Sequence, residues 1–141
     1  MKRFGSAAWN GSLREGKGSV STESRALESH PYTFFSRYGE KPGTNPEELL
    51  GAAHAACFTM SFVRQLGNAN FVPEHVHSKS EITIEKDGDG FSITSVHLTI
   101  TAKIPGIDHD TFQSIAMSAK AGCPVSKLIK VEIHFGATLI S

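Results

Sequence analysis

Apolar and polar residues alternate with a period of two along two long stretches in the second half of the chain. These stretches, residues 76–86 and 91–103, are rich in β-branched side chains, so the pattern predicts two half-buried strands. The run Asp-Gly-Asp-Gly at 87–90 separates them and favours a tight turn. We therefore expect the two strands to form an antiparallel hairpin.

Four shorter segments also have strand patterns. Residues 4–11 and 18–24 are separated by glycines, and residues 32–38 are rich in aromatic side chains and follow a proline. Residues 131–140 again alternate apolar and polar positions. The strands are thus predicted in runs, with helical segments between them.

Residues 46–67 are mostly small or apolar and are predicted to form one long helix. Asn45 is suited to cap this helix, Pro46 to occupy its first position and Gly67 to end it. Small residues on the helix allow another backbone to approach closely. Because residues 49–63 are apolar or small on most sides, the helix needs cover all round, and we expect a homodimer to complete that cover.

Two further helices are predicted near the C-terminal end. Asp108 is suited to cap a helix over residues 109–121, which Gly122 ends, and a shorter helix follows over residues 123–129. Separate runs of strands with helices packed against them indicate an α+β fold. The length fits a single domain over residues 1–141.

The charge balance excludes one large class of function. The chain has 14 basic and 14 acidic residues without a basic patch, so it lacks the electrostatic footprint of a nucleic-acid-binding protein. No apolar run approaches the roughly 18 residues of a membrane span, and the N-terminus lacks a secretory signal pattern. These features predict a cytoplasmic protein, in which thiols stay reduced and a static disulfide is not expected.

Two cysteines are present, and the first of them, Cys57, lies in the apolar part of the long helix. Burial there is expected to raise its pKa, which agrees with an inert buried thiol or with a reactive thiol that a cation activates. Arg37 is the candidate cation, because it comes just before the loop that leads into the helix. Arg14 and Arg25 are alternatives that spacing does not exclude.

The second cysteine, Cys123, lies between a helix-ending glycine and a proline, which is an N-cap-like position. Such a position lowers a thiol pKa and suits an attacking thiol, and the alternative is an incidental loop cysteine. Glu47, in the first turn of the long helix, lies about 15 Å from Cys57 along the axis. We therefore expect Glu47 to act through an arginine or from the other subunit.

Histidines are the remaining candidates for chemistry. His54, three residues before Cys57, is placed for a Cys–His pair or for a satisfied interface histidine. His75, His77 and His97 lie on two predicted strands, but no carboxylate or cysteine joins them at ligand spacing, so we expect no metal. The chain also lacks phosphate-loop, nucleophile-elbow and HExxH motifs, so neither phosphoryl transfer nor hydrolysis is supported, and no cofactor is predicted.

Several motifs together resemble the OsmC/Ohr family, and its osmotically inducible protein C branch in particular. The matching segments are Ala-Trp-Asn-Gly at 8–11, Gly-Lys-Gly-Ser-Val-Ser-Thr-Glu-Ser at 16–24, Thr-Asn-Pro-Glu-Glu-Leu at 44–49, Ala-Ala-His-Ala-Ala-Cys-Phe at 52–58, Pro-Gly-Ile-Asp at 105–108 and Ala-Gly-Cys-Pro-Val-Ser at 121–126. The resemblance extends over nearly the whole chain.

The resemblance implies an α+β fold with two antiparallel sheets around long central helices, in an intertwined homodimer with two active sites at its interface. It implies an organic hydroperoxide reductase in which Cys57 is the peroxidatic cysteine and Cys123 the resolving one. Glu47 matches the glutamate that holds the active-site arginine, and Arg37 matches that arginine. In the other branch of the family the arginine comes from an earlier loop, and the reductant is a dihydrolipoyl protein.

The implied chemistry is a thiol peroxidase cycle. The Cys57 thiolate attacks the peroxide and becomes a sulfenic acid, Cys123 condenses with it to an intrachain disulfide, and an external dithiol reduces the disulfide. We expect an apolar wall that favours alkyl hydroperoxides, formed by Phe34, Phe35, Phe58 and Met60. The alternatives are an apolar-ligand-binding module with two buried cysteines, and a redox sensor that forms the disulfide without turnover.

Overall fold

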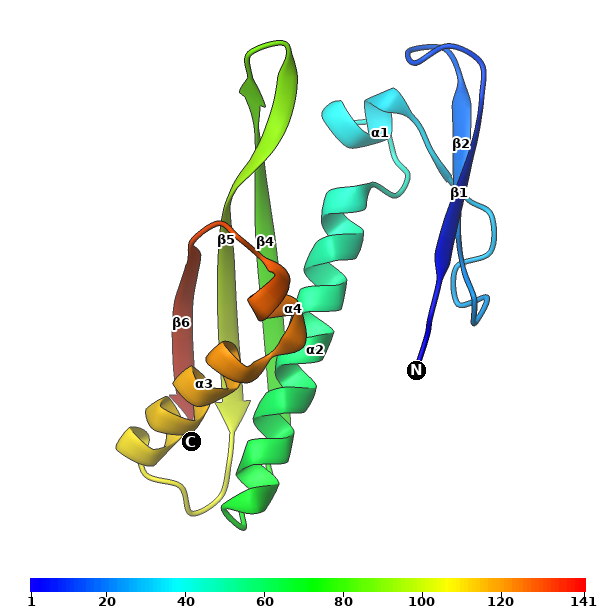
Figure 1. Cartoon of the computed structure of the whole chain (residues 1–141). Coiled ribbons are helices and arrows are strands. Elements are labelled where there is room, and N and C mark those ends of the chain that lie inside the picture. Colours follow the sequence, from blue (N-terminus) through cyan, green and yellow to red (C-terminus); the bar gives the residue numbers. More distant parts are fainter. The chain divides into compact units, whose positions relative to one another are not determined.

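The computed structural model describes residues 1–141, and the chain divides into two compact units, residues 1–49 and residues 50–141 (Figure 1). The first unit contains a small sheet and a short helix. The second contains a larger sheet and most of the helical residues. The α+β class is therefore confirmed, with one sheet in each unit.

The sheet of the first unit is formed by strands β1 (Gly5–Asn10), β2 (Lys17–Thr22) and β3 (His30–Tyr32), in the order β1-β2-β3. Both neighbouring pairs are antiparallel. Trp9 of β1 packs edge-on against Tyr32 of β3, with 5.4 Å between ring centroids. The first two strands predicted from the sequence are confirmed.

The third predicted strand, residues 32–38, is wrong for most of its length. Helix α1 (Phe34–Tyr38) occupies it, because Thr33 forms a reciprocal cap with Ser36. The Ser36 N–H donates to the Thr33 hydroxyl at 3.1 Å, and the Thr33 N–H donates to the Ser36 hydroxyl at 2.8 Å. These two local hydrogen bonds outweigh the strand propensity of the aromatic residues.

Helix α2 (Pro46–Asn68) begins as predicted but ends one residue later than expected. The Asn45 side chain caps it by accepting from the Glu48 N–H at 2.8 Å. The helix continues through Gly67, and Asn70 instead takes the left-handed conformation, with φ 64°. Asn tolerates that conformation because its short polar side chain bonds locally. No helix in the structure is both long enough and apolar enough to cross a membrane.

The sheet of the second unit is formed by strands β4 (His75–Asp87), β5 (Gly90–Lys103) and β6 (Ile133–Ile140), in the order β4-β5-β6. Strands β4 and β5 pair along their whole length as an antiparallel hairpin, as the alternation and the turn motif predict. The Asp87–Gly90 pair closes the hairpin, and Gly88 at its tip has φ +60°.

The expectation of two purely antiparallel sheets is wrong at one edge, because β5 and β6 are parallel. Helices α3 (His109–Gly122) and α4 (Pro124–Leu128) connect these strands. Such a crossover brings the chain back to the end of the sheet at which β5 begins, so the next strand runs in the same direction. Asp108 caps α3 as predicted, accepting from the Thr111 N–H at 2.8 Å.

The core of the second unit lies between one face of its sheet and two helices. Figure 1 shows α2 and α3 lying along the sheet. The buried side chains come from α2 (Phe58, Phe62 and Leu66), from β5 (Leu98, Ile100 and Ala102) and from α3 (Phe112, Ala116 and Ala119). This shared core fixes α2 against the helix pair that carries the second cysteine.

On one face of α2 a small residue allows another backbone to approach closely, as predicted. On another face the small residues are exposed. A Cβ atom at Gly51 would lie 2.6 Å from the carbonyl oxygen of Ser80, so only glycine lets α2 approach β4 this closely. On other sides of the helix the exposed residues are Ala52, Ala53, Ala56, Met60 and Val63. The chain by itself does not cover α2 all round, and the homodimer stays a prediction.

Candidate active site

Cys57 lies near the middle of α2, half-buried at the edge of an open pocket. The pocket has a volume of about 540 Å³ and is lined by Cys57, Met60, Ser61, Arg64, Gly122 and Pro124. Both α2 and the α3–α4 junction therefore contribute to it. A small molecule that enters this pocket meets the Cys57 thiol.

Cys123 links α3 to α4 and is fully buried. Its N–H donates to the carbonyl of Ala119 at 3.0 Å, which ends α3, and it is the N-cap residue of α4 with Pro124 following. The predicted N-cap position is confirmed. Proline suits the first helical position because it lacks the N–H that would have no partner there.

The two thiols meet inside the second unit. Both are free cysteines, and their side chains lie close enough that each thiol shifts the pKa of the other. Burial raises the pKa of Cys57; the N–H of Val125 opposes this rise, and the neighbouring Cys123 thiol adds to it. The structure thus brings together the two cysteines that the sequence placed on different helices.

The surroundings of Cys123 shift its pKa in the opposite direction, below the ordinary value. Burial alone would raise its pKa, but the Ser126 N–H, Cys57, the Ser126 hydroxyl and the Val125 N–H together hold the pKa below its ordinary value. Neither of the two backbone N–H groups forms a full cap hydrogen bond to the sulfur, so they act on it through their electrostatic field. In the pair, Cys57 therefore holds the proton more strongly than Cys123.

A buried histidine connects to this site through hydroxyl groups. His54 is 0% exposed; its Nδ1 lies 2.7 Å from the Ser80 hydroxyl, and its Nε2 lies 2.8 Å from the Ser126 hydroxyl. Burial lowers the pKa of His54, so it is neutral at neutral pH. Of the two alternatives for His54, the structure shows the histidine whose hydrogen bonds are all made. Its partners lie within the second unit of the same chain and not at an interface. Ser80 and Ser126 are not predictable from the sequence, because no local motif marks them.

Arg37 and Glu47 form an ion pair within the first unit. The Arg37 Nη2 donates to Glu47 Oε1 at 2.8 Å and its Nε donates to Oε2 at 3.3 Å. The Arg37 guanidinium also lies over the Tyr38 ring at 5.0 Å. The hydrogen bond with Glu47 raises the pKa of Arg37, so its charge is permanent. The expected partnership of Glu47 with an arginine is therefore found in the same chain.

The other predicted residues lie in different surroundings. Phe34 and Phe35 pack edge-on at 5.2 Å on α1, and the Arg14 guanidinium lies over the Phe34 ring at 4.8 Å. Phe58 is fully buried in the core of the second unit, and Met60 lines the Cys57 pocket. Arg64 also lines this pocket and was not predicted, although it lies seven residues after Cys57, which is the same face of a helix.

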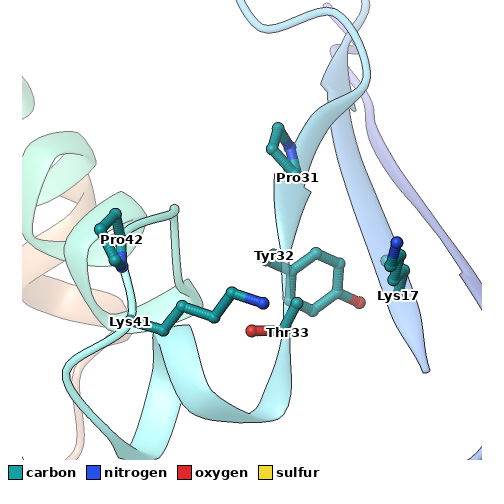
Figure 2. A pocket seen from close by; sticks show the side chains of 7 residues that line it. Lys17, Pro31, Tyr32, Thr33, Lys41 and Pro42 are labelled. Carbon is teal, nitrogen blue, oxygen red and sulfur yellow. The ribbon is translucent and has the colours of Figure 1, made fainter. Parts of the chain in front are cut away.

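A second hollow, of about 280 Å³, lies in the first unit. Figure 2 shows Tyr32 and Thr33 between Lys41, which extends toward them from the loop after α1, and Lys17 of β2. None of the predicted catalytic residues lines it. The residues that the sequence predicts for the chemistry therefore lie outside this hollow.

The fold and the thiol pair define an α+β redox protein with two cysteines. The sequence model of OsmC-like protein matches residues 39–137, and the chain belongs to this family. It is 48% identical to Peroxiredoxin OsmC of Escherichia coli (strain K12) over 133 residues, which are 94% of this chain and 93% of that protein. It is 33% identical to the organic hydroperoxide resistance protein of Xanthomonas axonopodis pv. citri (strain 306) over 98 residues, 69% of this chain and 67% of that protein.

Solved structures show the same fold at lower sequence identity. An OsmC-like protein from Mycoplasma pneumoniae has a TM-score of 0.78 at 14% identity, covering 100% of this chain and 99% of that chain. An organic hydroperoxide resistance protein OsmC from Legionella pneumophila has a TM-score of 0.69 at 24% identity, covering 96% of each chain. Together with its curated relatives, family membership makes the chain a peroxidase-type enzyme with a peroxide-related redox function.

Proposed function

We propose that the chain reduces organic hydroperoxides to alcohols through a sulfenic acid at Cys57, which Cys123 resolves as an intrachain disulfide. The observation that carries the proposal is the contact between the two thiols at an open pocket of one unit. A half-buried sulfur is accessible to a substrate, and a fully buried one beside it is protected from that substrate. The name of the Xanthomonas relative also points to organic hydroperoxides.

The first step is attack by the Cys57 thiolate on the distal oxygen of the hydroperoxide. The O–O bond breaks, the alkoxide takes a proton and leaves as an alcohol, and Cys57 becomes a sulfenic acid. Because burial raises the pKa of Cys57, the thiolate needs a permanent cation beside it. Arg37, held by Glu47, supplies that charge, to Cys57 of its own chain or of a partner chain.

The second step closes the disulfide. The Cys123 sulfur attacks the Cys57 sulfenic acid, the S–O bond breaks, and the oxygen leaves as hydroxide that becomes water. An external dithiol, such as a dihydrolipoyl protein, then reduces the disulfide by exchange. The cytoplasm supplies reductants of this kind, which is why the cycle belongs there.

Substrate selection follows from apolar surfaces. Met60, with an exposed fraction of 76%, supplies an apolar side chain to the Cys57 pocket. We assign Phe34 and Phe35 to the same apolar wall, and Phe58 to the core beneath the helix. Such a wall favours alkyl hydroperoxides over hydrogen peroxide, because apolar groups gain free energy when they leave water.

The uncovered stripe of α2 supports the homodimer. Ala52, Ala53, Ala56, Met60 and Val63 lie exposed along that helix. A charge at its centre, Ala56→Glu, is expected to yield monomers in sedimentation velocity, whereas Ser114→Glu on the exposed face of α3 keeps the dimer. A monomeric wild-type protein at micromolar concentration contradicts the assignment.

The decisive experiment compares serine variants of the two cysteines. Cys57→Ser is expected to abolish cumene hydroperoxide reduction with a dithiol reductant. Cys123→Ser is expected to release one alcohol per chain and then stop recycling through the disulfide. Full activity of Cys57→Ser overturns the proposal. No disulfide after one equivalent of hydroperoxide favours an apolar-ligand-binding module, and a disulfide without turnover favours a redox sensor.

A further inference from the structure

A chain of neutral polar side chains leads through the interior of the second unit to the first turn of α4, the helix whose N-cap is Cys123. It runs from the Ser80 hydroxyl on β4 through His54 on α2 to the Ser126 hydroxyl on α4, with contacts of 2.7 Å and 2.8 Å. His54 is 0% exposed and Ser126 is 9% exposed. A buried histidine with both nitrogens in hydrogen bonds has one fixed orientation, so the chain is a rigid feature.

The direction of these hydrogen bonds follows from their end point. A thiolate only accepts hydrogen bonds, so the Ser126 hydroxyl donates toward the Cys123 sulfur and its oxygen accepts from the Nε2–H of His54. Neutral His54 then has a bare Nδ1, which accepts from the Ser80 hydroxyl. Every donor in the chain thus points toward Cys123.

We propose that His54 is a positioning residue that holds the Ser126 hydroxyl as a donor toward Cys123, so that Cys123 works as a thiolate in both halves of the cycle. The inference rests on the proposed function for the roles of the two cysteines. It adds a specific task for a buried histidine and two serines that this function does not otherwise use.

In the resolution half, the donor favours the nucleophilic form of Cys123. The thiolate attacks the Cys57 sulfenic acid, the S–S bond forms as the S–O bond breaks, and hydroxide leaves to become water. The sulfur attacks only in its ionised form, so a stabilised thiolate keeps resolution fast at neutral pH.

When the disulfide is reduced, the same Ser126 hydroxyl favours Cys123 as the leaving group. An external thiolate attacks Cys57, the more accessible sulfur, and the electron pair of the S–S bond goes to Cys123. A leaving thiol with a lower pKa leaves faster, so the donor accelerates this step and directs the mixed disulfide to Cys57.

Few charges compete with this arrangement. The titratable side chain that interacts with Cys123 is Cys57 of α2. His54 of α2 contacts Ser126, and Arg64 of α2 lines the same pocket as Cys57. Lys120 of α3 lies over the Phe135 ring at 5.9 Å, and Lys127 of α4 is exposed. The β4 strand contributes only the neutral hydroxyl of Ser80 to the chain.

The test is the pH profile of the resolution step in the full-length protein. Reduced protein receives one equivalent of cumene hydroperoxide, dimedone traps the remaining sulfenic acid at timed intervals, and mass spectrometry counts it. We expect Ser126→Ala and His54→Gln to move the midpoint of the profile to higher pH and to slow resolution and dithiol reduction about three- to tenfold. That range follows from losing a hydrogen bond to a charged sulfur and the weak dependence of exchange rates on thiol pKa.

Three further variants separate positioning from folding. Ser126→Thr keeps the hydroxyl and is expected to restore the profile. Ser80→Ala removes the far donor and is expected to shift it in the same direction by less. Ser78→Ala removes a hydroxyl on the same strand that contacts Thr59 at 2.7 Å and not His54, so it is the matched control and leaves the profile unchanged.

An unchanged midpoint in both Ser126→Ala and His54→Gln overturns the proposal. If the wild-type protein forms no sulfenic acid, the proposed function fails, and the inference is then decided in the Cys57→Ser background. There, ultraviolet absorbance of the thiolate reports the ionisation of Cys123 directly. An ionisation midpoint that stays in place when Ser126→Ala is added also overturns the proposal, and a rise supports it.

Discussion

Cys57 and Cys123 lie in two different kinds of backbone surroundings. Cys57 lies in the middle of a 23-residue helix, where N–H groups are bonded within the helix, and burial raises its pKa. Cys123 lies at the junction of two helices, where the first turn of α4 faces its sulfur and holds its pKa low. One sulfur is accessible and holds its proton, and the other is buried and ionises more easily.

This difference shows why two cysteines in contact are not yet a complete peroxidase site. The proposed mechanism needs a fixed positive charge that ionises the accessible Cys57 thiol. In the second unit, Arg64 lines the Cys57 pocket. The Arg37–Glu47 pair of the first unit is such a fixed charge. The protein thus keeps the permanent cation and the neutral hydrogen-bonded chain at Cys123 in separate parts of the chain.

The largest expected effect is a difference between the two cysteines in how far hydroperoxide oxidises each of them when it is alone. In Cys123→Ser, excess cumene hydroperoxide is expected to carry Cys57 on to sulfinic and sulfonic acids, because no thiol resolves the sulfenic acid. In Cys57→Ser, the buried Cys123 is expected to stay reduced under the same conditions. Intact-mass spectrometry measures both, and equal oxidation of the two variants removes the distinction between the cysteines.

The next effect is that of the cation. Arg37→Met is expected to lower kcat/KM for cumene hydroperoxide about 100-fold, because a neighbouring opposite charge shifts a pKa by about 1–3 units. Glu47→Gln is expected to lower it less, since the arginine remains but is less well held. The control is Arg25→Met, an exposed arginine in the turn after β2. A loss that follows Arg14→Met instead assigns the role to Arg14.

A smaller effect concerns how closely α2 approaches the sheet. Gly51→Ala places a Cβ 2.6 Å from the Ser80 carbonyl and is expected to reduce the free energy of unfolding by about 1–3 kcal/mol. Gly67→Ala, in the same helix with open space around it, is the control and is expected to stabilise by up to about 1 kcal/mol. Urea unfolding measures both, and equal effects show that the close approach is not under strain.

The smallest expected effect is a change of the free energy of unfolding with pH. Burial lowers the pKa of His54, so unfolding allows it to take up a proton in acid, and the contribution to stability is present above its ordinary pKa and lost below it. The free energy of unfolding is expected to fall by at most about 1.4 kcal/mol for each pH unit below that value. His54→Gln is expected to flatten the slope, and His97→Gln, which changes an exposed histidine, to leave it unaltered. A slope that His54→Gln leaves intact excludes His54 as its source.

Local signals predicted much of the fold and the outline of the site. Caps at Asn45 and Asp108, the hairpin turn, and the N-cap position of Cys123 depend on neighbouring residues, and all four are confirmed. The helix over residues 34–38 was missed because a hydroxyl cap competed with aromatic strand propensity. Two hydrogen bonds decide between helix and strand in this segment, and the pattern of apolar and polar residues does not reveal them.

What the sequence did not predict depends on contacts between distant segments. The parallel pairing of β6 is decided by the path of the crossover, and Ser80 and Ser126 join His54 only after the sheet and helices pack. Motif spacing contains no information on such partners. The interpretation of Cys57 and Cys123 as a pair likewise came from family resemblance, and their mutual effect on each other's pKa agrees with it.

The contact between the two thiols has a mechanical consequence. When the disulfide of the proposed cycle closes, it ties α2 to the start of α4 and encloses the whole β4–β5 hairpin and α3 in one covalent loop. Closing a loop of roughly 65 residues removes enough freedom from the unfolded chain to add about 4 kcal/mol of stability in the chain-entropy description. The oxidised enzyme, while it waits for a reductant, is then more resistant to heat and proteases than the enzyme that is ready to react.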